Sequence, residues 1–176
     1  MSKFNVADKS TFTVAGIEFI KFPEVNGKVP VVAKNILFNS KFGDNNNLNN
    51  SFIIDKLNDI YIKIADEIGE KNICEFETDL RTPDGLRPYP NFKSKISIPT
   101  LDFYRDNVEI FDMYKTDCWW WTATPESASP HDAPDWSLCV SPLGNFDCHI
   151  SLYNNGGVRP FLIFESTLFE SYGTEE

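Results

Sequence analysis

Several residue types and motifs that assign proteins to a class are scarce in this sequence. Its 176 residues include four cysteines and two histidines, and no C-x-x-C spacing is present. Cysteines this few do not make a disulfide scaffold, and we interpret them as the reduced thiols of a cytosolic protein. The chain has no 18-residue apolar run and no apolar stretch of a secretory signal near residue 1. We therefore expect a cytoplasmic protein without membrane contact.

Basic residues are scarce in the second part of the chain. Residues 101–176 hold 13 acidic side chains against Arg105, Lys115 and Arg159, whereas residues 1–100 hold 13 acidic and 13 basic ones. The formal net charge of −10 thus arises after residue 100. Direct nucleic-acid binding is disfavoured, because it depends on Lys and Arg that neutralise phosphates. The acidic part either serves solubility or docks onto a basic partner.

Apolar residues, in contrast, are plentiful. They make up 41% of the chain, and fifteen Phe and four Trp are among them. This is enough to build a core, and the length favours one domain over residues 1–176. Twelve lysines against four arginines, with abundant Asn and Ile, is a bias that we associate with AT-rich bacterial or phage genomes.

Hydrophobic spacing predicts the elements of the first part of the chain. Alternation over residues 11–22 indicates two strands joined by a turn at Gly16, and residues 29–37 indicate a buried strand that begins at a proline. An Asn-rich loop follows. Residues 52–68 have helical spacing, with Leu57 on the apolar face, and Gly69 ends the helix.

The next segments have weaker periodicity. Residues 71–95 carry turn chemistry and are interpreted as irregular, and a short second helix is predicted to start near Thr100. The last third favours strands over the segments 119–124, 136–141, 147–153 and 158–164, with a hairpin turn at 142–145.

The tryptophan run and Arg159 are interpreted structurally. In a strand, Trp119 and Trp121 share one face and Trp120 points to the other. We expect Trp121 to be buried, whereas Trp120 is a candidate for exposure. Arg159 is predicted to bind a carboxylate or backbone carbonyls within the protein rather than a ligand.

The last third also carries a family resemblance. The segments 120–125 (WWTATP) and 157–164 (GVRPFLIF), with Val140 and Gly144 between them, resemble the carboxy-terminal signature of a family of uncharacterised bacterial and phage domains with a C-type-lectin-like fold. Looser similarities extend it over residues 12–165, which leaves 166–176 as an acidic tail. The resemblance implies an α+β fold with two helices packed on a small, mostly antiparallel sheet, long loops, and chain ends close together.

Proteins with this fold differ in function, so each activity has to be argued from residues. Relatives include calcium-dependent sugar binders, the variable receptor-binding proteins of retroelement-diversified phages, and the copper enzyme that makes formylglycine. The calcium-ligand motifs of the lectins are absent. Cys139 and Cys148 are expected to flank the 142–145 turn, as a copper pair would, but the surrounding enzyme motif is missing.

Zinc binding and catalysis are also disfavoured. His131, Asp132, Asp135 and His149 are ligand types for zinc, with poor spacing. No phosphate-binding loop or activated nucleophile is recognisable in the sequence. We therefore expect no metal, no cofactor and no catalysis.

A protein-binding face is the remaining hypothesis. We expect acidic and aromatic side chains from the loop before residue 136 and from the 142–147 turn to form it: Glu126, His131, Asp132, Asp135, Trp136, Asn145, Phe146 and Asp147. The predicted partner is a protein with a basic or nucleic-acid-binding surface. One such function is a phage or mobile-element accessory protein that inhibits a host defence nuclease, for example a CRISPR effector. The alternatives are a virion or cell-surface module that binds a glycan or host receptor, and an enzyme on the formylglycine-generating fold.

Overall fold

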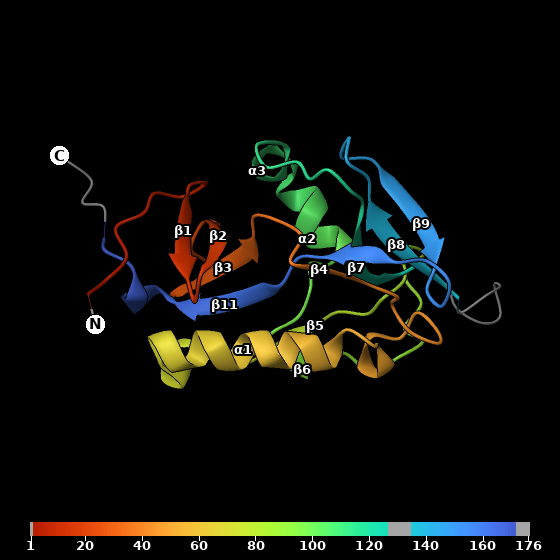
Figure 1. Ribbon diagram of the computed structural model, residues 1–176, viewed down its shortest axis with the longest axis horizontal. Coiled ribbons are helices and arrows are strands. Elements are labelled where there is room, and N and C mark those ends of the chain that lie inside the picture. The colour runs from red at the N-terminus through yellow and green to blue at the C-terminus, as the bar shows by residue number, and fades with distance from the viewer. Residues whose placement is uncertain (1, 127–134, 172–176) are drawn as a thin grey trace.

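The computed structural model describes residues 2–126 and 135–171. These residues form a mixed α+β structure with three α-helices (Figure 1). The helices are α1 (Ile54–Ile68), α2 (Leu101–Asp106) and α3 (Val108–Asp112). The strands are β1 (Thr11–Val14), β2 (Ile17–Lys21), β3 (Lys28–Ala33), β4 (Phe38–Ser40), β5 (Phe76–Thr78), β6 (Phe92–Ser94), β7 (Trp120–Pro125), β8 (Trp136–Val140), β9 (Phe146–Ile150), β10 (Gly156–Val158) and β11 (Phe161–Glu165).

The first sheet is antiparallel, with the order β1-β2-β3-β11. Its first two strands meet at Ala15 and Gly16, whose φ angles of 51° and 74° are both left-handed. A two-residue turn of this kind matches the twist of a hairpin. The predicted hairpin over residues 11–22 is confirmed.

The buried strand predicted for residues 29–37 is shorter in the structure. β3 contains Pro30 where its pairing with β2 ends: the Pro30 carbonyl accepts the Phe22 N–H at 3.0 Å, and proline has no N–H for the return bond. The chain leaves this sheet after Ala33. It then enters a second sheet at β4.

The second sheet has the order β4-β10-β7-β8-β9, and only the β10–β7 pair is parallel. The predicted hairpin around 142–145 is confirmed as β8 and β9. The single strand predicted over 158–164 is wrong, because β10 and β11 belong to different sheets. Pro160 has no N–H for a continuous ladder, and Arg159 turns into the interior.

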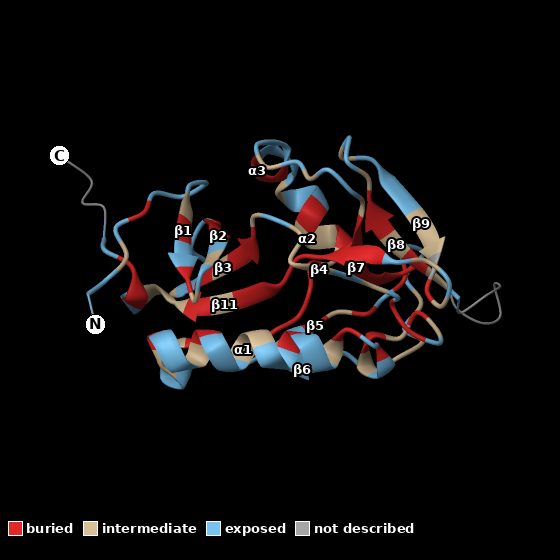
Figure 2. Ribbon diagram, in the orientation of Figure 1, coloured by how far each residue is buried: buried red, intermediate tan, exposed pale blue. Residues whose placement is uncertain are grey.

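The helices cover opposite sides of the strands (Figure 1). The apolar face of α1 packs into a large core that includes Leu57, Ile64, Phe19 and Trp121, and Figure 2 shows this inner side buried. The helix ends at Gly69, where φ is 87°. The prediction for residues 52–68, including the buried Leu57, is confirmed.

A second core lies beneath α2 and α3. It contains Tyr104, Phe111 and Trp120, and also Ile20 of the first sheet. The neighbouring strand residue, Phe19, lies in the large core, so the first sheet is apolar on both faces. α2 begins after Thr100, whose side-chain oxygen accepts the Phe103 N–H at 3.1 Å. The predicted helix is thus confirmed.

The expectation of two helices on one small sheet needs correction. α3 is a third helix, and the residues described form three sheets. The segment 71–95, expected to be irregular, contains β5 and β6, which pair with each other. Strands of three residues carry too little alternation to stand out in a sequence.

The two ends of the described chain lie together (Figure 1). The Phe4 N–H donates to the Leu168 carbonyl and the Glu170 N–H donates to the Phe4 carbonyl, both at 2.8 Å. Leu168 and Phe169 are buried in the large core. Proximity of the chain ends is confirmed, but the core extends past residue 165, so residues 166–171 are no tail. Among the described helices, none has the length and apolarity needed to cross a bilayer.

Candidate partner-binding surface

The predicted protein-binding residues come from the two ends of one hairpin. β8 and β9 run antiparallel, so the loop that precedes β8 and the turn that follows it lie at opposite ends of the hairpin. At about 3.3 Å per residue, a strand as long as β8 separates these ends by roughly 13 Å. The predicted set therefore divides into two groups.

The first group lies at the entrance to β8. Glu126 and Asp135 are exposed, and the Glu126 N–H donates to the Trp136 carbonyl at 3.0 Å. Trp136 itself is half-buried. His131 and Asp132 lie outside the described residues. The part of this group that the structure describes is mainly a strand end held by backbone hydrogen bonds.

The second group lies on the 141–147 turn and packs against α2 and α3. The Tyr104 hydroxyl donates to the Gly144 carbonyl at 2.8 Å, and its ring contacts Phe146 edge-on with 5.6 Å between ring centroids. Burial, and then the nearby Asp112 carboxylate, raise the pKa of Tyr104. The hydroxyl thus keeps its proton and remains a donor, which fixes the turn to the helices.

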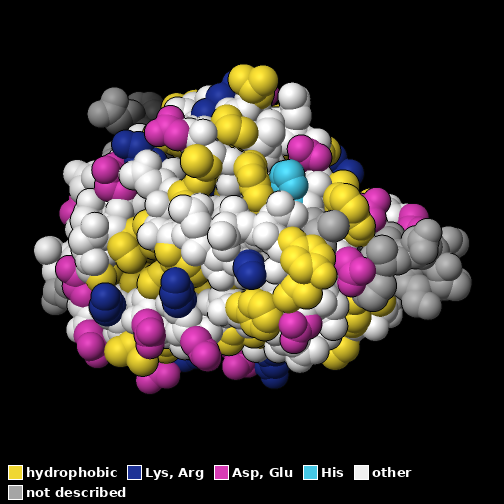
Figure 3. Space-filling view, turned by 45° about the vertical axis from the view of Figure 1, so that its right-hand side comes forward, with side chains coloured by type: hydrophobic (Ala, Val, Ile, Leu, Met, Phe, Trp, Pro, Cys, Tyr) yellow, Lys and Arg dark blue, Asp and Glu magenta, His cyan; other side chains and the backbone are white. Residues whose placement is uncertain are grey.

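Apolar side chains are exposed on both sides of this junction. Leu143 is 76% exposed, Met113 58% and Phe146 47%. Figure 3, which brings forward the right-hand side of Figure 1, shows hydrophobic side chains at the surface with acidic and basic side chains among them. Large apolar side chains exposed beside charged ones are typical of protein contacts.

An acidic segment lies beside these apolar residues. Asp112 and Lys115 both lie beside Gly144, whereas Asp147 points to the opposite face of β9 from Phe146, toward His149. Between residues 106 and 117 the chain has four acidic side chains and one basic one, Lys115. We call this area the α3–hairpin surface, defined by Asp112, Met113, Leu143, Asn145 and Phe146. Asp112, Met113 and Leu143 were not predicted as binding residues, and the first two lie in residues 106–117, which lack a periodic signal long enough to place α3.

The buried aromatic and arginine residues have a structural role. Trp120 and Trp121 are both buried, so the expected candidate for exposure was wrong, and Trp119 is the half-buried member of the run. Arg159 is 1% exposed. Its Nε and Nη2 donate to the carbonyls of Ala33 and Lys34, each at 3.0 Å, and its guanidinium lies 4.9 Å from the Trp120 ring. The predicted carbonyl-binding role is confirmed.

The cysteines are not arranged for catalysis. Cys139 pairs with Asp147 and Cys148 pairs with Leu138, so neighbouring positions of the hairpin place the two thiols on opposite faces. All four cysteines are free. Burial raises the pKa of Cys139 to about 12 and that of Cys74 to about 11, which keeps these thiols protonated at neutral pH.

The described residues contain no cluster of three or more potential metal ligands. His149 instead stacks on Trp119 with 4.0 Å between ring centroids, and its Nε2 lies 3.9 Å from Asp147 Oδ2.

Comparison of the chain with protein-family models, with curated proteins and with solved structures finds no match. Function must therefore be inferred from the surface itself.

Proposed function

We propose that this protein is a non-catalytic module that binds another protein through the α3–hairpin surface. The observation that carries the proposal is the exposure of Met113, Leu143 and Phe146 next to Asp112, which belongs to a segment with four acidic side chains and one basic one. Exposed apolar side chains supply contact area, and the carboxylates select a basic partner and speed its association. The raised pKa values of the buried thiols agree with a role other than cysteine chemistry.

The partner class follows from charge. A surface with these carboxylates is complementary to a Lys- and Arg-rich groove of the kind that holds nucleic acid. We propose that the partner is a host defence nuclease, such as a CRISPR effector, and that the protein is a phage or mobile-element accessory protein that blocks the groove. The proposed C-type-lectin-like fold is supported by the adjacent chain ends and by β11 pairing with β3 in an antiparallel sheet.

A capture experiment with matched variants tests the proposal. Tagged protein is mixed with bacterial lysate, and bound proteins are identified by mass spectrometry. Phe146→Ala and Asp112→Lys should lose the captured basic protein. Phe52→Ala and Asp59→Lys should retain it, because Phe52 is 46% exposed, like Phe146, but precedes α1 on the other side of the molecule.

The salt dependence of the captured complex separates the alternatives. Binding between an acidic surface and a basic groove should weaken as salt is raised, since salt screens exposed charges. A complex indifferent to salt, or equal capture by all four variants, would contradict the proposal. A ligand recovered as a neutral glycan would favour a virion or cell-surface recognition module instead.

A further inference from the structure

Two adjoining recesses lie on another part of the molecule, between β5, the 79–85 segment and α2. One encloses about 270 Å³ and is lined by charged residues and threonines. The other encloses about 220 Å³ and is lined mainly by Phe76, Phe103, Phe161 and other apolar side chains. Asp79 and Thr100 line both recesses. A charged recess thus opens directly beside an apolar one.

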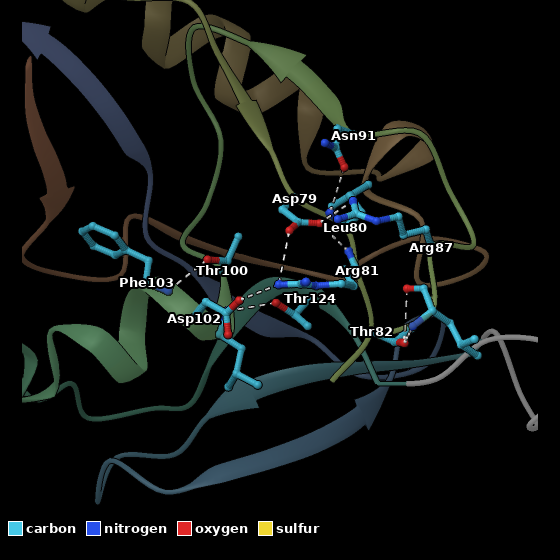
Figure 4. Close-up of polar contacts among 12 residues, drawn as sticks. Asp79, Leu80, Arg81, Thr82, Arg87, Asn91, Thr100, Asp102, Phe103 and Thr124 are labelled. Carbon is cyan, nitrogen blue, oxygen red and sulfur yellow. Dashed lines mark hydrogen bonds and ion pairs between the residues drawn. The ribbon is translucent and has the colours of Figure 1, made fainter. Parts of the chain in front are cut away.

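Arginines are concentrated at the charged recess. The chain has four, and Arg81 and Arg105 line this recess while Arg87 lies next to it. Figure 4 shows the Arg81 guanidinium between two carboxylates: Nη2 is 3.7 Å from Asp79 Oδ2 and 3.6 Å from Asp102 Oδ2. Three of the four arginines therefore gather in one place.

The Arg81 guanidinium retains its hydrogen-bonding capacity. Its two ion-pair distances are longer than hydrogen bonds, and it donates none to any residue in 2–126 or 135–171. A planar guanidinium with free N–H groups is suited to two parallel hydrogen bonds with a carboxylate. The side chain is 43% exposed, so a ligand can reach it.

The two carboxylates beside Arg81 are held in place. Asp79 Oδ1 accepts the Arg81 backbone N–H at 2.9 Å, and Asp102 Oδ1 accepts from Arg105 Nη2 at 2.5 Å. A guanidinium and two carboxylates thus lie together within one small recess. A ligand with a single charge would meet a like charge here, whereas a ligand with both charges would find a partner for each.

The apolar recess has rigid walls. The Phe103 and Phe161 rings meet edge-to-face at 5.0 Å between centroids, and Phe76 meets Phe161 in the same way at 5.2 Å. Glu77 also lines this recess and adds a negative charge. Sites for drug-sized ligands enclose about 300–1,000 Å³, so this recess is on the scale of one side chain.

We propose that the two recesses form one site for a free α-amino acid with an apolar side chain. Arg81 binds the carboxylate, Asp79 and Asp102 hold the ammonium group, and the side chain enters the apolar recess beside Phe103. The site is separate from the α3–hairpin surface. The inference does not depend on the proposed protein partner.

Calorimetric titration of the full chain with four probes tests the ligand chemistry. L-phenylalanine should bind saturably. L-alanine, N-acetyl-L-phenylalanine and L-phenylalaninamide should each bind at least about tenfold more weakly, because each lacks one of the three recognised groups. Equal binding of the N-acetyl compound would overturn the proposal and indicate a peptide carboxy terminus, and equal binding of the amide would overturn it and indicate an amino terminus. No binding of L-phenylalanine at millimolar concentration would also overturn it.

Two variants test the position of the site. Arg81→Gln should weaken L-phenylalanine binding by about tenfold or more, whereas the control variant Lys63→Gln should change it less than about twofold, because Lys63 is exposed on α1 and lines neither recess. Amide chemical shifts of Thr82, Thr100 and Thr124 should move on titration, which provides a readout independent of affinity. Equal affinities of the two variants, or shifts confined elsewhere, would contradict the assignment.

Discussion

At the scale of single residues, Arg159 shows how a charge is retained in an apolar interior. Its hydrogen bonds to Ala33 and Lys34 satisfy two backbone carbonyls where β3 ends, and its flat guanidinium lies over Trp120. Burial lowers the pKa of Arg159 to about 10, which leaves it charged at neutral pH. A lysine ammonium cannot both donate along these two directions and stack on a ring.

We expect Arg159→Lys to lower the free energy of unfolding by about 2 kcal/mol or more, as is usual when hydrogen bonds of a buried charged group are lost. The measurement is urea denaturation followed by circular dichroism. The exposed Arg105→Lys serves as the control and should change stability by less than about 0.5 kcal/mol. Similar effects of the two substitutions would show that Arg159 is not held as described.

The buried thiols predict a loss of stability in alkali. The folded-state pKa of Cys139, about 12, and that of Cys74, about 11, exceed the ordinary value of 9.0, so the folded state keeps protons that the unfolded state releases. This stabilisation is complete below about pH 9 and is lost as the pH rises toward 11 and 12. Cys139→Ala should therefore lose less stability than the unsubstituted protein between about pH 8 and pH 10.5. Equal losses in denaturant titrations would contradict this.

At the scale of elements, local chemistry predicted more than connectivity did. The sequence marked a turn at Gly16, a helix end at Gly69 and a helix start at Thr100. Each of these residues acts locally, through its own backbone conformation or through a side-chain hydrogen bond to the first turn of the helix. The separation of β10 from β11 was not predictable in this way. It depends on which distant strand each half meets, and residues 158–164 have the composition of a single strand.

The Gly156 position is predicted to reject any side chain. A Cβ built there would lie 2.5 Å from Trp121 Nε1 and would overlap the Trp119 ring. Gly156→Ala should therefore cost about 1–3 kcal/mol through overpacking, measured by thermal or urea unfolding. Gly16→Ala isolates backbone strain, since φ is +74° but no atom lies within 4 Å, and should cost about 1 kcal/mol. A smaller effect at Gly156 than at Gly16 would argue against the tryptophan packing.

At the scale of the whole molecule, the sequence predicted part of the candidate surface. Asn145 and Phe146 were recognisable from turn chemistry, but Asp112 and Met113 lie at the end of a helix with too few residues to show a period. The charged recess beside Arg81 was likewise not predictable from the sequence. It forms only because α2 places Asp102 against the segment after β5, a contact across 21 positions of the chain.

Truncation tests where the core ends. A chain that stops after Glu165 should be destabilised by several kcal/mol, because it loses the buried Leu168 and Phe169 and the hydrogen bonds to Phe4. Phe169→Ala alone should cost about 3–5 kcal/mol, and the exposed Thr167→Ala should be nearly neutral. The measurement is denaturant unfolding monitored by circular dichroism. A stable chain ending at residue 165 would restore the tail interpretation.

The passage of residues 156–165 through both larger sheets has a consequence for how the molecule denatures. Gly157 is tied to Trp120 in one sheet, and Leu162 to Val31 in the other, with only Arg159 and Pro160 between the two strands. Unfolding of either sheet should displace the strand that the same segment contributes to the other sheet. We therefore expect unfolding to be cooperative over both sheets. Tryptophan fluorescence and far-ultraviolet dichroism should therefore report one coincident transition. Two separated midpoints would mean that the sheets unfold independently.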